Sequence, residues 1–550
     1  MPSKETLEIE DAQRAIDAIL SKGISAGNPF AVAIVDENGE IVLLIRQDGT
    51  SASDVLNAER KAYTASYIGR DTSIYRQQIT HDGRTIADWS NNKITTLHGG
   101  LTIHRRSQVI GGIGVSGTGN EDEDEKLALA GAEALVGPET MLRLQNKDIR
   151  PALRPAKTIP LAVDIAPSQS KFKKITNLPG LSSQEGIAPD FVEVGGLFFT
   201  SGISGINLAT GEIPEEPALQ FKNAWGNLKT LVEAAGHSTD EIGLITNFID
   251  NQDFRAHINP GWLELFPDAN NRPARKTTSF PLPAGKGGVQ LQAIGVAGEK
   301  RTSIEIQGLT HKDPLPNGVR MGSYVFSSVI VPWDLSTSEP VIGEDAQTDK
   351  CFENMRVFME KAGGTVDDIA LQWVYLNDFA YQPFMVDVYL EAWPLNSYQA
   401  ARKTFRYPMS GQIQIQVIGN INETRSNHEI EGHGHHDPIP MGARIGNLYC
   451  SSGVSGVDPN SNDKLEPVEG IEGQAAHGLQ NLVSLVESGK GIVDDIGLVT
   501  ILVQDYADIP IIDKEWIKVF PNEATRPARQ IMKMGVQRKN RVQYHMLGVI

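Results

Sequence analysis

The sequence predicts an α+β protein in which an α/β domain is followed by three copies of one α+β unit. Two observations support this prediction. Similar segments centred on Arg275, Arg402 and Arg529 recur at a fixed interval, since 402 − 275 and 529 − 402 both equal 127. Residues 1–150 lack this repeat and carry a different pattern of helices and strands.

The composition is that of a globular chain with more acidic than basic residues. Of the 550 residues, 40% are hydrophobic and 21% charged, and 50 basic against 68 acidic residues give a net charge of −18. Without a basic block, such a chain is a poor match for nucleic acid or an anionic membrane surface. There is no apolar run of the roughly 20 residues that a membrane span needs, no signal-like start, and only two cysteines, Cys351 and Cys450. A cytoplasmic location is expected.

Each repeat shows the same order of elements. A β-rich start is followed by a helix with a Gln-x6-Asn pair, a strand, a second helix, the arginine segment and a last strand. The first helix has apolar residues at helical spacing and ends at glycine. The strands are expected to gather on one side of the two helices. The three copies of the first helix lie at 219–236, 347–364 and 473–490, and those of the last strand at 289–296, 413–420 and 542–549.

These motifs resemble the RidA (YjgF) family, which is marked by an S-G strand, a Q-x6-N helix, a P-A-R segment and a final β-strand. The resemblance covers about residues 185 to 550, three times over. It implies chorismate-mutase-like units that assemble as trimers around a central sheet barrel, with active sites in clefts between subunits. Three units in one chain are therefore expected to form an intramolecular pseudo-trimer. The expected boundaries are 1–150, a linker at 151–184, and units at 185–305, 306–426 and 427–550.

The N-terminal region predicts a helix at 7–27, a hairpin at 30–49, a helix at 51–70, and a strand, a glycine-rich turn and a helix within 97–135. The segments KAYTA (61–65) and IGGIGVSG (110–117) make it similar to the GlcG/HbpS family, also seen at the end of PduO-type enzymes. Some relatives bind haem or a corrinoid and others have no established ligand, so the resemblance leaves a haem or corrinoid open here. His98 is the candidate axial ligand, with His81 and His104 as further candidates.

The resemblance also names catalytic positions in the repeats. In deaminating relatives the P-A-R arginine holds a substrate carboxylate, a role that suits the guanidinium fork. The alternative is an arginine in a structural salt bridge. The relatives' last strand carries a glutamate that places or activates water, and here that position is glutamine, which cannot take a proton as a carboxylate does. The predicted catalytic residues are Arg275, Arg402, Arg529, Gln290, Gln414 and Gln543.

The residue after each arginine also departs from the relatives, which tend to have a small side chain there. It is Lys276, Lys403 or Gln530. These departures put plain 2-aminoacrylate-type deamination in doubt and leave a carboxylate-binding cleft intact.

Further candidates lie at the start of each unit. Serines on or beside the first strand, and arginines in the lead-ins HKDPLPNGVRMG (311–322) and HHDPIPMGARIG (435–446), are predicted to bind substrate; the alternatives are ordinary strand-end serines and exposed arginines. These residues are Ser201, Ser328, Ser452, Arg320 and Arg444. The stretch NHEIEGHGHHDP (427–438) could bind a metal through His433, His435 and His436, but a polar connector between units is favoured and no metal is assigned.

Two classes of function follow. The favoured one is a hydrolase or deaminase that acts on a small carboxylated imine, enamine or other C–N substrate between units, with no cofactor in the repeats. A cyclic-amide hydrolase that uses a serine nucleophile is a variant of this class. The alternative is a sensor that binds haem or a small molecule, with a non-catalytic repeat scaffold. The expected partner is a small molecule, and a homo-oligomer is expected because relatives of both halves oligomerise.

Overall fold

The computed structural model describes residues 7–23, 28–81, 85, 91–105, 108–136, 173–181, 184, 186–283, 285–309, 311–395, 397–461, 463–534 and 536–550. The chain divides into two compact parts, Met1–Ala152 and Leu153–Ile550. No helix in the described ranges is long and apolar enough to cross a membrane. Most of the predicted linker at 151–184 lies outside the described residues.

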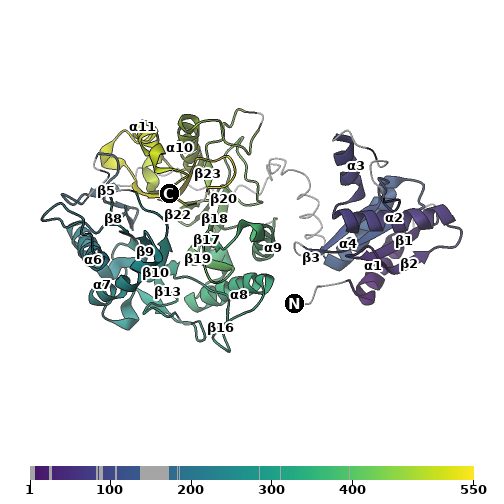
Figure 1. The fold of residues 1–550 in the computed structure, drawn as a ribbon, viewed down its shortest axis with the longest axis horizontal. Helices are drawn as coiled ribbons and strands as arrows, with labels where there is room; N and C mark the ends of the chain where they lie inside the picture. The colour runs from purple at the N-terminus through teal and green to yellow at the C-terminus, as the bar shows by residue number, and fades with distance from the viewer. Residues whose placement is uncertain are drawn as a thin grey trace. The chain divides into compact units, whose positions relative to one another are not determined.

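The N-terminal part is a four-stranded sheet with helices on both faces (Figure 1). Its elements are α1 (Ile9–Lys22), β1 (Ala31–Asp36), β2 (Ile41–Arg46), α2 (Ala52–Ile68), α3 (Thr72–His81), β3 (Gly100–Arg105), β4 (Gln108–Ser116) and α4 (Glu121–Val136). The strand order is β2-β1-β4-β3. The predicted helices and the hairpin are present; α3 and the second strand of the 97–135 block were not foreseen.

The glycine run IGGIGVSG (110–117) lies in strand β4 as far as Ser116, and only Gly117 belongs to the turn that follows. A Cβ at Gly114 would lie 2.0 Å from the Ala58 carbonyl oxygen, and one at Gly112 would lie 2.3 Å from that of Ala62. These glycines therefore let the backbone of α2 pack directly against the sheet.

The described residues of the C-terminal part form three main sheets that share one six-strand order, and a two-stranded sheet, β15-β16. The first unit comprises β5 (Lys173–Thr176), β6 (Phe191–Val194), β7 (Leu197–Thr200), β8 (Ile203–Ser204), α6 (Pro217–Ala234), β9 (Ile242–Ile249), α7 (Ile258–Leu265), β10 (Ala274–Ser279) and β11 (Val289–Val296). Its sheet order is β10-β9-β11-β7-β6-β5, with β8 paired to β11. Strands β9 and β10 are parallel, and the other pairs are antiparallel.

The other two units repeat this order. The second unit contains β12 (Thr302–Ile304), β13 (Gly318–Met321), β14 (Tyr324–Ser327), β15 (Trp333–Asp334), β16 (Glu339–Pro340), α8 (Glu344–Ala362), β17 (Ile369–Leu376), α9 (Gln382–Ala392), β18 (Ala401–Arg406) and β19 (Ile413–Asn420). The third contains β20 (Arg425–His428), β21 (Gly442–Ile445), β22 (Leu448–Ser451), β23 (Val454–Ser455), α10 (Ile471–Ser488), β24 (Ile496–Val503), α11 (Ile509–Val519), β25 (Ala528–Met532) and β26 (Val542–Val549).

The first strand of each sheet lies ahead of the predicted unit boundary. Strand β5 falls in the segment expected to be a linker, β12 precedes residue 306, and β20 begins before residue 427. Each is an edge strand paired only with the strand that follows it. Their short, mostly polar sequences carry little of the alternation that predicts a strand.

The repeat markers support the backbone of each unit. The amide nitrogen of Asn227 on α6 donates to the carbonyls of Ser204 and Ile206, and Asn354 and Asn481 bond the equivalent carbonyls. Gln220 accepts from the Gly288 N–H just before β11 and donates to the Pro214 carbonyl. The Gln-x6-Asn pair therefore fastens the first helix to the loops around it, which is a structural role.

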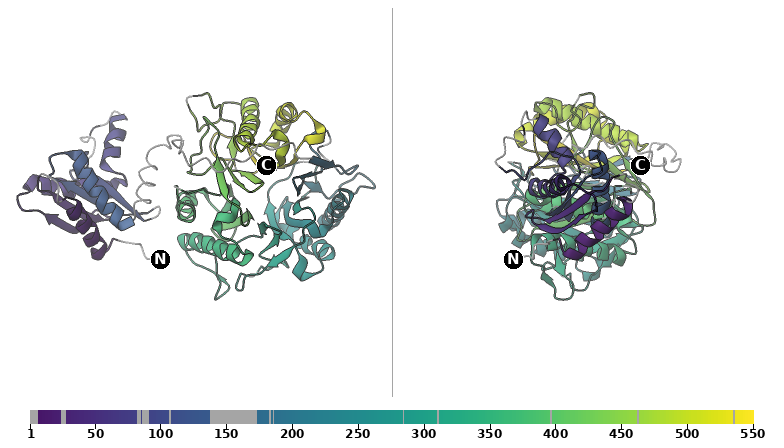
Figure 2. Two further views of the ribbon diagram at one scale, coloured as in Figure 1. Left: turned by 180° about the vertical axis from the view of Figure 1, so that it is seen from behind. Right: turned by 90° about the vertical axis from the view of Figure 1, so that its right-hand side faces the viewer.

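The three sheets close into a ring around one shared apolar core, as the pseudo-trimer prediction requires. Strand β9 contacts β13 and β14, β17 contacts β21 and β22, and β24 contacts β6 and β7. Leu244, Leu371 and Leu498 occupy equivalent positions in one buried cluster drawn from all three units. The helix pairs lie on the outside of the sheets (Figures 1 and 2). We call the contacts between units 1 and 2, 2 and 3, and 3 and 1 the first, second and third interfaces.

Candidate functional site

The three arginine segments sit at the three interfaces and make one contact in common. Each arginine lies on the edge strand β10, β18 or β25, next to the following unit. The backbone N–H of Arg275 donates to the Ser328 hydroxyl at 3.0 Å, that of Arg402 to Ser452 at 2.9 Å, and that of Arg529 to Ser201 at 2.9 Å. The predicted arginines and serines are therefore brought together, each pair across an interface.

The serine hydroxyls are occupied by these backbone bonds. Ser201 and Ser452 also donate to the carbonyls of Pro189 and Pro440, both at 2.6 Å. A serine nucleophile needs a neighbouring base to take its proton, and these two protons already point at backbone carbonyls. This geometry favours a structural role for the serines and gives no support to the serine-dependent cyclic-amide variant.

At the first interface the Arg275 guanidinium keeps one nitrogen without a partner. Nη2 donates to Asn259 Oδ1 at 3.0 Å and lies 3.4 Å from Asp313 of the second unit. The guanidinium carbon sits 4.5 Å from the ring centroid of Trp262. Nη1 is buried and has no hydrogen-bond partner among the described residues. Burial lowers the pKa of Arg275 to about 10, so the side chain remains a cation at neutral pH.

At the second interface Arg402 is held in a similar way. Its Nη2 pairs with Asp437 of the third unit, and its guanidinium lies 4.8 Å from the Tyr389 ring centroid. Nη1 contacts only the Met385 sulfur, at 3.6 Å. Nε is buried without a partner in the described part of the chain. Two of the arginines thus keep a buried N–H group that no described protein atom accepts.

At the third interface Arg529 makes two side-chain bonds. Its Nε donates to Gln184 at 2.6 Å, and its Nη1 donates to Asp513 at 2.6 Å. The guanidinium lies 5.2 Å from the Trp516 ring centroid. Gln184 also donates to the Arg529 carbonyl at 3.3 Å. Protein groups therefore occupy more of this arginine's donors than at the other two interfaces.

The last-strand glutamines meet the residue after the arginine of the preceding unit. Lys276 Nζ donates to Gln414 at 2.7 Å, and Lys403 Nζ donates to Gln543 at 2.7 Å. At the third interface Gln530 donates to Gln290 at 3.1 Å. The sequence marked both positions as unusual, but only the fold shows that they contact each other across each interface.

Three titratable residues at the interfaces were not proposed as site residues from the sequence. Asp313 and Asp437, the partners of Arg275 and Arg402, lie in the repeated lead-in beside the histidines that mark it. His311, in the same lead-in, has a buried Nε2 with no hydrogen-bond partner in the described residues. Burial, with the nearby charges of Arg275 and Lys276, lowers the pKa of His311 to about 4. It is therefore a neutral base at pH 7.

Arg320 and Arg444, which the sequence proposes as substrate-binding residues, bond to backbone carbonyls, and their role toward a substrate stays a prediction. Arg320 donates to the carbonyls of Gly322 and Ala362, and Arg444 donates to those of Gly446, Gly489 and Ile550. Ala362 ends helix α8, and Gly489 follows α10. The two arginines therefore satisfy carbonyls at helix ends, where a cation is favourable.

The histidine-rich stretch 427–438 is ordered by backbone contacts. His433 is buried, and its ring nitrogens face the carbonyls of Gly434 and Ser455 at 3.1 and 3.2 Å. His436 pairs with Glu466 at 3.4 Å. Within the described ranges no group of three His, Cys, Asp or Glu side chains is arranged to hold a metal ion.

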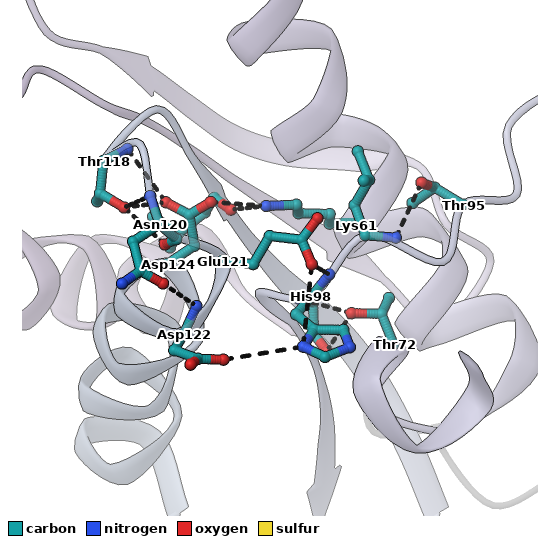
Figure 3. A network of polar contacts seen from close by, with 12 residues as sticks. Lys61, Thr72, Thr95, His98, Thr118, Asn120, Glu121, Asp122 and Asp124 are labelled. Carbon is teal, nitrogen blue, oxygen red and sulfur yellow. Dashed lines mark hydrogen bonds and ion pairs between the residues drawn. The ribbon is translucent and has the colours of Figure 1, made fainter. Parts of the chain in front are cut away.

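A buried polar network marks the N-terminal part (Figure 3). Lys61 donates to Asp124 and to the Val115 carbonyl, both at 2.8 Å, and all three are removed from solvent. His98 lies on the rim, with its Nδ1 4.0 Å from both Glu121 and Asp122. Asp124 is thus the buried ion-pair partner of Lys61. His104 is partly buried in β3, and the side chain of His81 lies outside the described residues.

Comparisons with known proteins agree with both resemblances. Residues 7–133 match the family model described as haem degrading protein HbpS-like, and residues 188–282 match the model described as endoribonuclease L-PSP. Among solved structures, a double mutant of Streptomyces reticuli HbpS is 30% identical, with 24% of this chain and 90% of that chain covered and a TM-score of 0.23.

Two curated relatives resemble single repeat units. A RutC family protein of Haemophilus influenzae is 31% identical over 107 residues, which is 19% of this chain and 82% of the relative. The 2-iminobutanoate/2-iminopropanoate deaminase of Escherichia coli is 30% identical over 106 residues, which is 19% of this chain and 83% of that protein.

Proposed function

This chain belongs to the RidA family, which includes the RutC proteins, and from that premise we propose that its first and second interfaces hydrolyse small carboxylated imines. Water adds to the C=N carbon, and the products are a 2-oxo acid and ammonia. The observation that carries the proposal is the buried Nη1 of Arg275, which has no hydrogen-bond acceptor among the described residues.

The arginine is suited to an anionic group. A guanidinium binds a carboxylate through charge-assisted hydrogen bonds, and Arg275 and Arg402 each retain a buried donor for one. Asp313 lies 3.4 Å from Arg275, at the long end of such contacts, and leaves part of the positive charge uncompensated. At the third interface Nε and Nη1 of Arg529 already donate to Gln184 and Asp513, so fewer of its N–H groups are left for a substrate.

Water needs a base at this site, and the glutamines cannot serve as one. His311 supplies it at the first interface in our proposal. Its imidazole is neutral at pH 7, its buried Nε2 has no described partner, and it lies within electrostatic range of Arg275. It would accept the proton of the attacking water.

The test is ammonia release from imines formed in situ, with and without a carboxylate. The double variant Arg275→Ala with Arg402→Ala should lose at least about 10-fold in rate with the carboxylated imine, since a charge-assisted hydrogen bond contributes roughly 1.5–3 kcal/mol. Arg529→Ala is the matched control and should keep most of the activity. Thermal unfolding of each variant checks that it folds. Equal rates in wild type and the double variant would exclude the arginine mechanism.

Haem binding by the N-terminal domain is the second candidate function, and the HbpS-like match with the rim position of His98 favours it. An imidazole is a common axial ligand to haem iron. The surrounding acids Glu121 and Asp122 do not complement haem propionates, so the fit rests on the axial ligand. Haem titration of the full chain should give a saturable Soret change that His98→Ala removes, with a corrinoid as competitor.

The molar mass of the protein in solution would test the predicted homo-oligomer.

A further inference from the structure

The first and second interfaces each hold a buried lysine that has a neutral partner. Lys276 is 3% exposed and Lys403 7% exposed, and each donates to a glutamine of the next unit at 2.7 Å. Neither has a carboxylate within ion-pair distance among the described residues. An isolated buried ammonium is costly. These two amines therefore differ from lysines whose role is to form a salt bridge.

Other buried lysines of the chain show what a structural amine looks like. Lys61 forms an ion pair with Asp124 at 2.8 Å. Lys173 donates to the carbonyls of Ile496 and Thr525 at 2.8 and 2.7 Å and thereby ties β5 to the third unit. Lys276 and Lys403 have one amide acceptor each, so the nitrogen lone pair becomes available once a proton is lost.

We propose that Lys276 and Lys403 are amine nucleophiles that form covalent imines with small carbonyl or imine compounds. This goes beyond the proposed hydrolysis, because it requires neither the arginine nor a substrate carboxylate. Burial lowers the pKa of Lys276 to about 7 and that of Lys403 to about 8, so a neutral amine is populated near neutral pH. Desolvated lysines of this kind are known nucleophiles.

The surroundings of Lys276 contain aromatic rings and no carboxylate within ion-pair distance among the described residues. Lys276 Nζ lies 4.1 and 4.9 Å from the ring centroids of Tyr375 and Tyr407, contacts that favour the ammonium ion, whereas burial favours the neutral amine. The charged or titratable groups near it are Arg255, whose charge further lowers its pKa, and His311, which is neutral at pH 7. A carboxylate in place of Gln414 would do the opposite and hold the ammonium ion.

The side chain of Lys403 packs against a glycine of the next unit. A Cβ at Gly453 would lie 3.2 Å from both Cδ and Nζ of Lys403, so glycine at this position leaves room for the lysine. The Phe405 ring centroid lies 5.8 Å away. The third interface has no amine at this position, because Gln530 takes the place of lysine.

The chemistry balances without a further reactant. The amine lone pair adds to the carbonyl carbon, both amine protons pass to the carbonyl oxygen, and water leaves as the C=N bond to Nζ forms. With an N-unsubstituted imine in place of the carbonyl compound, the same addition transfers both protons to the substrate nitrogen, and ammonia leaves. Addition of water to the lysine imine then returns the 2-oxo compound and the free amine.

The test is reductive trapping on the full-length protein. The protein is incubated at pH 8 with 2-oxobutanoate or propanal and cyanoborohydride, and the modified lysines are mapped by mass spectrometry. Lys276 and Lys403 should be modified at least about tenfold faster than surface lysines and than Lys173. Modification at equal or lower rates would overturn the proposal.

The matched variant is Lys276→Gln with Lys403→Gln, which recreates the native Gln530–Gln290 pair at both interfaces and should therefore fold. It should lose the fast trapping. The variant Arg275→Ala with Arg402→Ala should keep it, which separates this proposal from the proposed hydrolysis. Ammonia release that is unchanged in the arginine variant and lost in the lysine variant would refute the arginine-dependent hydrolysis alone. Ammonia release without trapping at either lysine would refute the nucleophile alone.

Discussion

The first and second interfaces share their backbone geometry with the third but differ from it in chemistry. The N–H to serine bond is 3.0, 2.9 and 2.9 Å long in the three. A lysine donates to the last-strand glutamine at two interfaces, and a glutamine does so at the third. The same two interfaces keep an arginine donor without a described partner. The fold therefore fixes where side chains meet, and individual substitutions decide what they can do there.

The largest expected effect tests the lysine side of this comparison. Replacing Lys276 by Gln should raise the free energy of unfolding by up to about 4 kcal/mol below pH 7, because the folded protein must bury or discharge that amine. The pKa of Lys276 is about 7 in the folded state, below its unfolded value. Between about pH 7 and pH 10 the unfolded chain binds the extra proton, so wild-type stability rises with pH in that window.

The gain in free energy of unfolding from Lys276→Gln should therefore shrink toward pH 10. Urea denaturation of wild type and variant at pH 6.5 and at pH 9.5 measures this gain. The reverse change, Gln530→Lys, should lower the free energy of unfolding. This loss should be largest below pH 7 and should shrink toward pH 10. A difference between wild type and variant that stays constant with pH would show that Lys276 remains charged.

A smaller effect is expected at the acid partners of the arginines. Asp437→Ala leaves Arg402 without a charged partner in the described residues and should cost about 3 kcal/mol, as for other broken buried pairs. Asp313→Ala should cost about 1 kcal/mol, because that contact is longer and Asn259 still accepts from Arg275. Unfolding midpoints of the two variants provide the comparison, and equal losses would contradict the difference drawn between these interfaces.

The smallest effect should be the same at every interface. Ser201→Ala, Ser328→Ala and Ser452→Ala each leave the N–H of an arginine without its acceptor, at a cost of about 1 kcal/mol. Because the three bonds have nearly the same length, the three losses should agree closely in thermal unfolding. One serine with a much larger loss would indicate that the ring is less regular than its hydrogen bonds imply.

The repeat made much of the fold predictable. The 127-residue interval placed the first helix of each unit, and the order of elements after each arginine segment placed the last strand. Both occur where expected, and the last strands match β11, β19 and β26 residue for residue. Sequence reasoning missed β5, β12 and β20 because short edge strands such as RSNH lack an apolar alternation. It also read the β4 glycines as part of a turn, since their packing against α2 depends on a distant helix.

The site was harder to predict because its contacts join different units. Gln414 and Lys276 are 138 residues apart in sequence, and no local pattern links them. The lead-in arginines Arg320 and Arg444 looked like anion ligands because only their charge was visible, whereas the fold directs them to helix-end carbonyls. The catalytic roles proposed for the interface arginines and glutamines stay predictions that the variants above can test.

The ring closes within one polypeptide, since β24 of the third unit packs against β6 and β7 of the first. In a ring of three identical chains, one codon change alters every contact surface at once, and dilution pulls the subunits apart. Here a single substitution reaches one surface in three, and the neighbours are held at a high effective concentration whatever the amount of protein. Gene fusion of this kind lets one surface gain new chemistry while another preserves the assembly.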